Sequence, residues 1–416
     1  MTKNKLVKWQ IVVTLICIFA SIGSSQTNWM KNPNNPVLIP GGSGSWDETS
    51  SIVNTILFHE NIYKMWYEGD KGIGFATSPD GIDWTKDTLN NPVLEPGLSG
   101  SWDEMGINNA SVLIKDNIYH MWYSGIDIFD DNRIGHATST DGINWIKDTL
   151  NPVIDLGEPG SWDDEEVMHP FVIYENDTLK MWYNGHDGIT QRILFATSLD
   201  GKIWKRYTQH PMLEPGSGGT WDSNELGPLS IVYSENLYHM WYTGWNFADF
   251  LQIGYATSPN GFDWAKSSAV LSPGDQGEWD NGAVALPYVI VEDSLFKMWY
   301  GGTDGNLFQT GYATSDLPVD VKNIDDIIPV QFSLSQNYPN PFNPSTKIRF
   351  TILNFEFTNL KIYDIIGNVV ATLVNQELCE GKYEVEFDGY ELTSGVYFYI
   401  LKSGNFIETK KMILLR

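Results

Sequence analysis

Short runs of hydrophobic residues recur along most of this chain, and the runs repeat as one unit of about sixty residues. The clearest copy begins at Gly100-Ser101-Trp102-Asp103, passes through a run rich in β-branched residues to Met121-Trp122-Tyr123, and ends near Trp145. In all five copies the Met lies eighteen residues after the Asp of the Trp-Asp pair. The triplets begin at Met65, Met121, Met181, Met240 and Met298. A period near sixty residues, whose central segment is kept without insertion, predicts a repeat architecture.

Each copy contains four runs with the pattern of β-strands. In the second copy they are residues 110–114, 118–123, 133–139 and a run around Trp145. Asp116-Asn117 and Asp141-Gly142 separate the runs, and such pairs favour tight hairpins because both turn positions accept positive φ. Helical periodicity is absent from this region. Four antiparallel strands in each repeat predict the blade of a β-propeller.

The fifth copy is incomplete, and its missing strand is found near the N-terminus. Ala313-Thr314-Ser315-Asp316 is followed by Leu317-Pro318, without the Gly and Trp of the other copies. Asn28-Trp29-Met30-Lys31 matches Asn144-Trp145-Ile146-Lys147 of the second copy. We therefore expect residues 26–316 to form an all-β, five-bladed propeller closed by its N-terminal strand. Closure removes the free sheet edges that invite aggregation.

The flanking segments differ in composition from the repeats. Residues 1–25 combine Lys3, Lys5 and Lys8 with an apolar run and small residues, which is typical of a signal peptide and too short for a membrane span. Residues 317–330 are acidic and are predicted to be a linker. Residues 331–416 contain short alternating strands and are predicted to form a small antiparallel β-sandwich. The expected strands are residues 347–352, 360–364, 369–374, 383–387 and 396–402.

Charge and cysteine content narrow the choice of partners. The chain has 26 Lys and Arg against 52 Asp and Glu, a formal net charge of −26. An acidic surface repels phosphate backbones, so nucleic acid is not an expected partner. Cys17 lies in the signal peptide, which leaves Cys379 as a single thiol and allows no internal disulfide. We expect a mature monomer without a transmembrane segment.

The C-terminal segment resembles type IX secretion sorting domains. The matching stretches are Phe332 to Thr346, with its Asn337-Tyr338-Pro339-Asn340-Pro341 core, then Leu392 to Tyr399, and the terminal Lys410 to Arg416. The resemblance implies Sec export to the periplasm and then passage through the type IX machinery. It therefore implies a protein that is secreted or held at the outer cell surface.

The repeats resemble the five-bladed propellers of glycoside hydrolase family 43 and its relatives. The shared features are the five copies, the Met-Trp-Tyr-x-Gly strand end and the Ala-Thr-Ser-x-Asp-Gly-x-x-Trp hairpin. The resemblance implies an extracellular poly- or oligosaccharide as the partner, and calcium as a possible ligand of the channel. Asp127, Asp130 and Asp131 are clustered, but they form no calcium-loop signature. No cofactor is required by any motif.

Comparison of the five copies separates scaffold from site. Residues present in every copy are most simply structural, and they are listed here: Asp47, Asp103, Asp163, Asp222 and Asp280, with Trp66, Trp122, Trp182, Trp241 and Trp299. We expect the aspartates to accept hydrogen bonds at the strand starts and the tryptophans to pack between blades. Site residues should be polar, should differ between copies, and should lie on the face where the long connections meet the first strands.

That criterion selects an uneven set of polar residues. The candidate substrate-binding residues are Asn108, Asn109, Asp127, His169, His186, Arg192, Trp245 and Asn246. The resemblance implies a base Asp, a helper Asp and an acid Glu on successive blades, and Glu166 is the match for the acid. Its partner is sought among Glu48, Glu225 and Asp187, because blade one has no further inner Asp and blade two has Asn108. Two hypotheses stay open: a glycosidase-like enzyme, and a non-catalytic propeller that binds glycan or protein.

Overall fold

A computed structural model describes residues 29–234, 236–246, 250–293, 295–316, 332–353, 356–378, 381–390 and 392–415. The chain divides into two compact units, one of residues 25–320 and one that includes residues 321–416. The described residues form strands, turns and loops, and no helix occurs among them. The predicted signal peptide, the predicted linker, Cys17 and Cys379 lie outside the described residues.

Within its described residues, the larger unit consists of five four-stranded antiparallel sheets. The first contains β2 (Ile52–His59), β3 (Ile62–Gly69), β4 (Gly72–Ser78) and β5 (Thr85–Lys86). The second contains β6 (Gly106–Lys115), β7 (Ile118–Ile126), β8 (Asn132–Ser139) and β9 (Ile146–Lys147). The third contains β10 (Glu166–Glu175), β11 (Thr178–His186), β12 (Gln191–Ser198) and β13 (Lys205–Arg206). The fourth contains β14 (Glu225–Ser234), β15 (Leu237–Trp245), β16 (Gln252–Ser258) and β17 (Ala265–Leu271).

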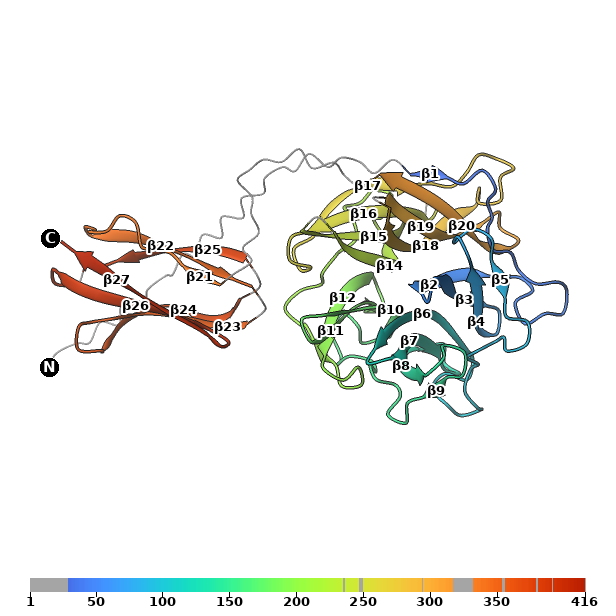
Figure 1. Ribbon diagram of the computed structural model, residues 1–416, viewed down its shortest axis with the longest axis horizontal. Coiled ribbons are helices and arrows are strands. Elements are labelled where there is room, and N and C mark those ends of the chain that lie inside the picture. Colours follow the sequence, from blue (N-terminus) through green and yellow to red (C-terminus); the bar gives the residue numbers. More distant parts are fainter. Residues whose placement is uncertain are drawn as a thin grey trace. The chain divides into compact units, whose positions relative to one another are not determined.

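The fifth sheet combines the two ends of the repeat region. It contains β18 (Ala283–Glu292), β19 (Leu295–Thr303) and β20 (Phe308–Asp316), with β1 (Met30–Lys31) added beside β20. Met30 pairs with Thr314 and Lys31 with Ala313. The first strands contact one another in chain order, and β18 also contacts β2 (Figure 1). The arrangement is propeller-like, with the first strands at the centre and the fourth strands, β17 excepted only two residues long, at the outside.

The tryptophans of the Met-Trp-Tyr triplets join neighbouring sheets. All five are almost fully buried, as expected for scaffold residues. Trp66, Trp122, Trp182 and Trp299 each donate from Nε1 to a glycine carbonyl in the next sheet's outer hairpin, at 2.7–3.3 Å. Trp241 faces the fifth sheet, which lacks that hairpin, and its buried Nε1 has no hydrogen-bond partner among the described residues. It packs instead edge-on against Trp29, with ring centroids 5.9 Å apart.

The repeated aspartates anchor the outer strands. Each is buried and accepts hydrogen bonds or an ion pair from a tyrosine hydroxyl and a basic side chain of the fourth strand. The groups are Asp47 with Tyr67 and Lys86, Asp103 with Tyr123 and Lys147, Asp163 with Tyr183 and Arg206, Asp222 with Tyr242 and Lys266, and Asp280 with Tyr300 and Lys31. A buried carboxylate is costly unless it is hydrogen-bonded and paired with a positive charge, and these partners meet both needs.

Every first strand contains a β-bulge, a break in its register with the second strand. The break follows the second or third residue of the strand in all five sheets. The breaks fall between Val53 and Thr55, Asn108 and Ser111, Met168 and Phe171, Leu226 and Leu229, and Ala285 and Tyr288. Asn109, His169 and Leu286 have positive φ of 48°, 54° and 50° within these bulges. Bulges redirect side chains, and backbone strain of this kind is often found at functional sites.

The C-terminal unit contains two sheets that share one core. β21 (Ser333–Leu334), β22 (Ser345–Ile352) and β25 (Gly381–Asp388) form one sheet, and β23 (Glu356–Tyr363), β24 (Val369–Leu378), β26 (Gly395–Ser403) and β27 (Phe406–Leu414) form the other. Ile348, Leu360 and Tyr399 are buried between them. The five predicted strands are present, and β21 and β27 were not predicted because their alternating pattern is short or interrupted by charge.

Candidate functional site

A cavity of about 630 Å³ opens where the first strands of the larger unit begin. All five sheets contribute to its wall, through strand starts, bulges and the ends of the second strands. Its polar groups include Glu68, Asn108, Asn109, His169 and Glu225, and Trp245 and Phe308 add aromatic surface. A concave site with a few convergent polar groups and aromatic rings suits a small or extended polyol.

Five of the sequence-predicted residues line this cavity. They are Asn108, Asn109, His169, Glu225 and Trp245. Glu166 is the first residue of β10 and pairs with His186 at the end of β11, outside the cavity lining. Burial raises the pKa of Glu166, and Asp130, Asp131 and Glu225 act in the same direction. Glu166 and His186 therefore lie on the rim rather than in the wall.

Glu48 and Asn246 have structural partners instead. The Glu48 carboxylate accepts from the Gly44 N–H at 2.9 Å, and the same contact recurs between Glu104 and Gly100 at 2.7 Å. The expectation that Glu48 is a catalytic partner is not supported by its position, because the residue belongs to a repeated turn. Asn246 is buried and donates to the Thr220 carbonyl at 3.0 Å.

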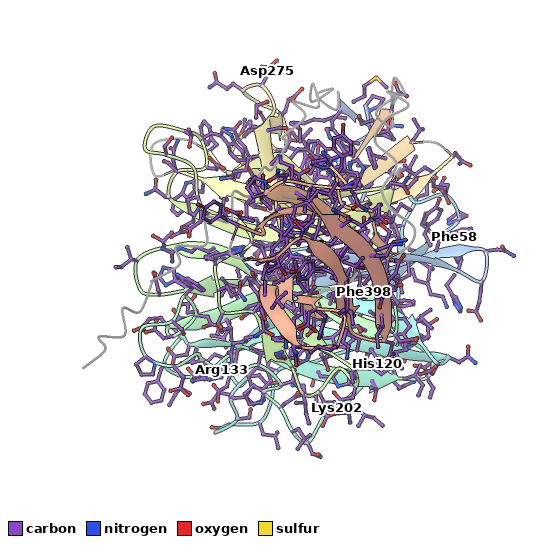
Figure 2. The ribbon with its side chains drawn as sticks, turned by 90° about the vertical axis from the view of Figure 1, so that its left-hand side faces the viewer. Phe58, His120, Arg133, Lys202, Asp275 and Phe398 are labelled. Carbon is purple, nitrogen blue, oxygen red and sulfur yellow. The ribbon has the colours of Figure 1, made fainter. Side chains whose placement is uncertain are left out.

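Two ion-paired hairpins account for three more predicted residues. Asp187 accepts from the backbone N–H groups of Ile189 and Thr190 and from Arg192 at 2.6 Å. Asp127 and Arg133 repeat this arrangement in the second sheet at 2.6 Å. Arg133 lies at one end of that sheet and His120 toward the other (Figure 2). Asp127, Asp187 and Arg192 thus stabilise their own loops. None of the three lines the cavity.

Glu68 is a cavity residue that the sequence analysis did not select. It follows the Met-Trp-Tyr triplet of the first sheet, and its Oε2 accepts from the Asn109 backbone N–H at 3.2 Å and from Asn109 Nδ2 at 3.4 Å. Burial raises the pKa of Glu68 to about 7, and the backbone hydrogen bond from Asn109 acts in the opposite direction. Since Oε2 accepts these N–H groups, the proton of the neutral form is carried by Oε1.

The signal for Glu68 was present within the repeated motif. The position after Met-Trp-Tyr is occupied by Glu68, Ser124, Asn184, Thr243 and Gly301 in the five sheets. Ser124 accepts from the His169 N–H at 2.9 Å and Thr243 from the Leu286 N–H at 3.0 Å, so this position regularly receives the bulge of the next sheet. Only one of the five residues is acidic, and the comparison between copies identifies it.

His169 presents one defined nitrogen to the cavity. Its Nδ1 lies 3.1 Å from Asn184 Oδ1, while Asn184 Nδ2 donates to the Leu226 carbonyl at 2.7 Å. Because the amide nitrogen is used as a donor, Asn184 Oδ1 must accept, and the proton of His169 lies on Nδ1. Burial lowers the pKa of His169 to about 4, so the ring is neutral at pH 7 and Nε2 is a hydrogen-bond acceptor.

The clustered aspartates of the second sheet are engaged by their own loop. Asp127 accepts from two backbone N–H groups and from Arg133, and Asp131 also pairs with Arg133 at 3.4 Å. No group of three or more His, Cys, Asp or Glu side chains with metal-binding geometry occurs in the part of the chain that the structure describes. We derive no step through a metal ion.

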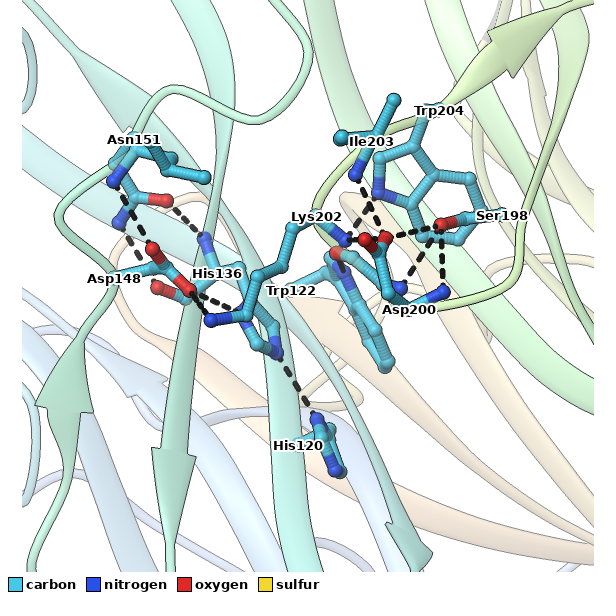
Figure 3. Close-up of polar contacts among 12 residues, drawn as sticks. His120, Trp122, His136, Asp148, Asn151, Ser198, Asp200, Lys202, Ile203 and Trp204 are labelled. Carbon is cyan, nitrogen blue, oxygen red and sulfur yellow. Dashed lines mark hydrogen bonds and ion pairs between the residues drawn. The ribbon is translucent and has the colours of Figure 1, made fainter.

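A second polar cluster lies away from the cavity. His120 Nδ1 is 3.1 Å from His136 Nε2, and His136 Nδ1 is 3.4 Å from the Asp148 carboxylate, which pairs with Lys202 at 2.6 Å (Figure 3). His136 is fully buried and packs on Trp122. In the first and third sheets a phenylalanine, Phe75 or Phe195, occupies its place opposite the tryptophan. The cluster joins the second and third sheets.

Comparison with known proteins identifies the C-terminal unit. Residues 336–415 match the family described as a secretion system C-terminal sorting domain. The chain carries a type IX sorting domain. This domain directs the protein to the cell surface or the extracellular space, as the sequence motifs predicted. Among the described residues, no helix has the length and apolar character needed to cross a membrane.

The larger unit is similar to several proteins. An uncharacterized protein of Mycobacterium tuberculosis is 26% identical over 288 residues, which cover 64% of this chain and 92% of that protein. A 1,2-beta-oligomannan phosphorylase of Thermoanaerobacter is 28% identical over 245 residues, 55% of this chain and 75% of that protein.

Solved structures show the same fold. A putative glycoside hydrolase from Parabacteroides distasonis superposes with a TM-score of 0.58 at 18% identity, covering 71% of this chain and 98% of that one. A thermostable family-43 glycoside hydrolase gives a TM-score of 0.53 at 20% identity, covering 70% and 93%. At these identities the likeness concerns the fold, and function has to be argued from the cavity.

Proposed function

We propose that this protein is an exported carbohydrate-active propeller that binds an extracellular glycan in the central cavity and hydrolyses it. The proposal includes a closed ring of five blades, completed by β1, with the cavity at its mouth. The pairing of β1 with β20 and the contact of β18 with β2 support the closed ring. The fold relatives whose names include glycoside hydrolases and a mannan phosphorylase support a glycan as the ligand.

One observation carries the enzymatic part of the proposal. Two carboxyl groups, Glu68 and Glu225, line one cavity from the first and fourth sheets, which are not neighbours in the ring. Glycoside hydrolysis uses two carboxyl groups on either side of the scissile bond, one protonated and one ionised. With a pKa of about 7, Glu68 retains its proton in a large fraction of molecules at neutral pH, which suits a general acid.

The step assigns a role to each group. Glu68 donates its proton from Oε1 to the leaving glycosidic oxygen as the bond from that oxygen to the anomeric carbon breaks. A water molecule forms the new bond to the anomeric carbon and gives its proton to the Glu225 carboxylate. Glu166, close enough to Glu225 for their charges to interact, keeps the rim acidic without entering the step.

The remaining wall residues orient the sugar. Trp245 offers a ring on which a pyranose can stack, and Asn108 and Asn109 supply amide groups for hydroxyls. His169 Nε2 accepts a hydrogen bond from a hydroxyl and cannot donate one, because the proton is held on Nδ1. Asn109 and His169 come from bulges whose backbone N–H groups donate to the preceding sheet, so this part of the site is preorganised.

Product analysis tests the proposal directly. The purified protein is incubated with arabinan, xylan, mannan and β-mannoside oligosaccharides, and released reducing sugar is measured. We expect Glu68→Gln and Glu225→Gln to abolish release, while Glu158→Gln, an exposed acid remote from the cavity, retains it. Unchanged release by both cavity variants would remove these residues from the mechanism.

A second function, glycan binding without turnover, is favoured by one contact. Glu68 receives the bulge N–H of the next sheet just as Ser124 and Thr243 do, so its carboxylate also fulfils a structural requirement. Binding of a glycan by the wild-type protein with no release of sugar, and with equal affinity in Glu68→Gln, would select this function.

A further inference from the structure

The cavity wall carries negative charge that no basic side chain of the wall offsets. Glu68, Asp70 and Glu225 line the cavity, and no Lys or Arg does so among the described residues. The proposed step uses only Glu68 and Glu225, so Asp70 is an additional acid. It is exposed and is held by the backbone N–H and the hydroxyl of Thr49, which carry no charge. A cleft lined by charge of one sign attracts ligands of the opposite sign.

Glu166 adds a further carboxylate on the rim next to Glu225. Both residues begin a first strand, β10 in the third sheet and β14 in the fourth, and each pairs with the last residue of the second strand. The equivalent positions of the second and fifth sheets are Gly106 and Ala283, which have no charged group. Since β10 contacts β14, two neighbouring sheets bring their carboxylates to the same side of the mouth.

The Glu166 carboxylate has neither a hydrogen bond nor an ion pair within the described part of the chain, although it is partly buried. Burial raises its pKa, the charge of His186 opposes this effect, and the charges of Asp130, Asp131 and Glu225 add to it. A partly buried carboxylate among like charges is unfavourable, because it loses hydration and meets repulsion. Such an arrangement is typical of a site that receives an opposite charge.

The two arginines of the adjoining hairpins do not supply the missing positive charge. Arg133 is bound by Asp127 at 2.6 Å and Arg192 by Asp187 at 2.6 Å, and each arginine also pairs with a second carboxylate. Each guanidinium is therefore already neutralised by acids of its own sheet. The acids of the cavity and of its rim are balanced by neither arginine, and a positively charged ligand complements them.

From this distribution we infer that the cavity takes a sugar unit with a protonated amine, an unacetylated 2-amino sugar, and that Glu166 receives its ammonium group. The inference rests on the proposed function and names the class of its substrate. In a 2-amino sugar the amine is bonded to the carbon next to the anomeric carbon. In the proposed step Glu225 acts beside the anomeric carbon, so the neighbouring amine lies on the side where Glu166 adjoins Glu225.

The hydrogen-bonding groups of the wall suit an ammonium group. An ammonium group has three N–H donors and no acceptor, and the site presents carboxylates and the acceptor nitrogen Nε2 of His169. An acetamide at the same carbon is uncharged and gains nothing from the additional acids. A sulfate or carboxylate group there would be repelled by them. A free amine is thus the substituent that uses the acids that the proposed step leaves unused.

Matched oligosaccharides test the inference with the full-length protein. Chitosan tetrasaccharide, its fully N-acetylated form and cellotetraose share one backbone and linkage and differ only in the group at C2. Galacto- and manno-configured oligosaccharides with the same three groups complete the set. In calorimetric titrations at low salt, we expect the amine form of one configuration to bind at least about tenfold more tightly than its hydroxyl form. Added salt should narrow this difference, because it screens the attraction.

Substitution of Glu166 tests the assigned partner of the amine. We expect Glu166→Gln to lower the affinity for the amine form about five- to tenfold and to leave the affinity for the hydroxyl form unchanged, because only the charge is removed. Glu158→Gln, which removes an exposed acid that does not line the cavity, is the control and should bind every form as the wild type does.

Each other outcome contradicts a stated part of the inference. An amine form that binds no more tightly than the hydroxyl form overturns the inference and leaves the glycan-acting function intact. Equal affinity of the wild type and Glu166→Gln for the amine form overturns the assignment of Glu166. If tetralysine or calcium competes as well as the amine form, the mouth attracts any cation, and the inference of an amino sugar is overturned. Absence of binding to every neutral and cationic glycan overturns the proposed function as well.

Discussion

Two sets of equivalent positions in the larger unit have opposite character. The buried aspartates, such as Asp103 and Asp163, have the same kinds of partner in every sheet, a tyrosine hydroxyl and a basic side chain. The residues after the Met-Trp-Tyr triplets, such as Glu68 and Ser124, differ in every sheet although each faces the axial bulges. Repetition thus marks the residues that hold sheets together, and divergence at one repeated position marks the residues available for a ligand.

Glu68→Gln should give the largest effect at the divergent positions. Removal of a general acid lowers kcat by about 10²- to 10⁴-fold, and steady-state kinetics on a cleaved glycan measures it. In the wild type, activity should fall as pH rises above about 7, because the protonated form is lost. Glu158→Gln, which removes an exposed acid that does not line the cavity, is the control and should retain kcat within about threefold. An unaltered pH profile in Glu68→Gln contradicts the assignment.

The same variant should be more stable than the wild type at high pH. Since the folded pKa is raised above the unfolded value, the wild type loses stability as pH rises from about 4.5 to 7. Glutamine does not ionise, so Glu68→Gln should gain about 1–3 kcal/mol at pH 8 relative to the wild type, and little at pH 4. Urea denaturation at the two pH values measures the difference.

Asp163→Ala tests a position that holds the same residue in every sheet, and it should lower stability. The substitution leaves the partly buried Arg206 and the Tyr183 hydroxyl without their shared acceptor. Loss of one partner from a buried ion pair costs about 3–5 kcal/mol, measured by urea denaturation. Asp275→Ala, at an exposed turn, should change stability by less than about 0.5 kcal/mol. Equal effects of the two variants would show that the aspartates are not anchors.

His136→Phe tests a repeat position whose residue also differs between sheets but which lies away from the cavity. Burial lowers the pKa of His136 to about 4, so the folded state excludes a proton that the unfolded state binds below about 6.5. Stability is therefore complete above pH 6.5 and falls by about 3 kcal/mol as pH drops toward 4. Phenylalanine, as in the first and third sheets, should remove this share of the acid sensitivity. His210→Phe, on an exposed loop, is the control, and denaturation curves measured alongside should show the acid sensitivity of the wild type.

Trp245→Ala should give the smallest effect. Loss of a stacking ring weakens glycan binding by about 0.5–1.5 kcal/mol, or about two- to tenfold, in a titration. Trp245→Phe should recover part of the affinity, because a smaller aromatic face remains. If alanine and phenylalanine bind equally, the ring is not a sugar platform.

The sequence predicted the repeated elements better than the divergent ones. The spacing of Trp102 and Met121 was sufficient to place strands, because both the period and the turn residues are local signals. Asn108, His169 and Glu225 were found because they differ between copies. The bulges that aim Asn109 and His169 into the cavity depend on register between strands, which one strand's sequence does not specify.

Other residues were missed for different physical reasons. Glu68 was overlooked because it lies inside a motif assigned to the scaffold as a whole. Arg192 was assigned to substrate binding and Asp187 to catalysis, because the ion pair between them depends on the folded hairpin and is not visible in the sequence. In the C-terminal unit, the adjacent Lys410 and Lys411 interrupt the apolar pattern of β27, which lies against β26, so its strand character comes from pairing.

The pairing of β1 with β20 has a consequence for how fast the protein reaches its final state. Met30 and Thr314, 284 positions apart, must meet before the fifth sheet has its fourth strand. Contacts of such high sequence separation slow folding, because the entropy of closing the loop is lost before the contact forms. The first described strand of the larger unit therefore has no partner until β20 has been made, and the sheet edge that it covers stays unpaired until then.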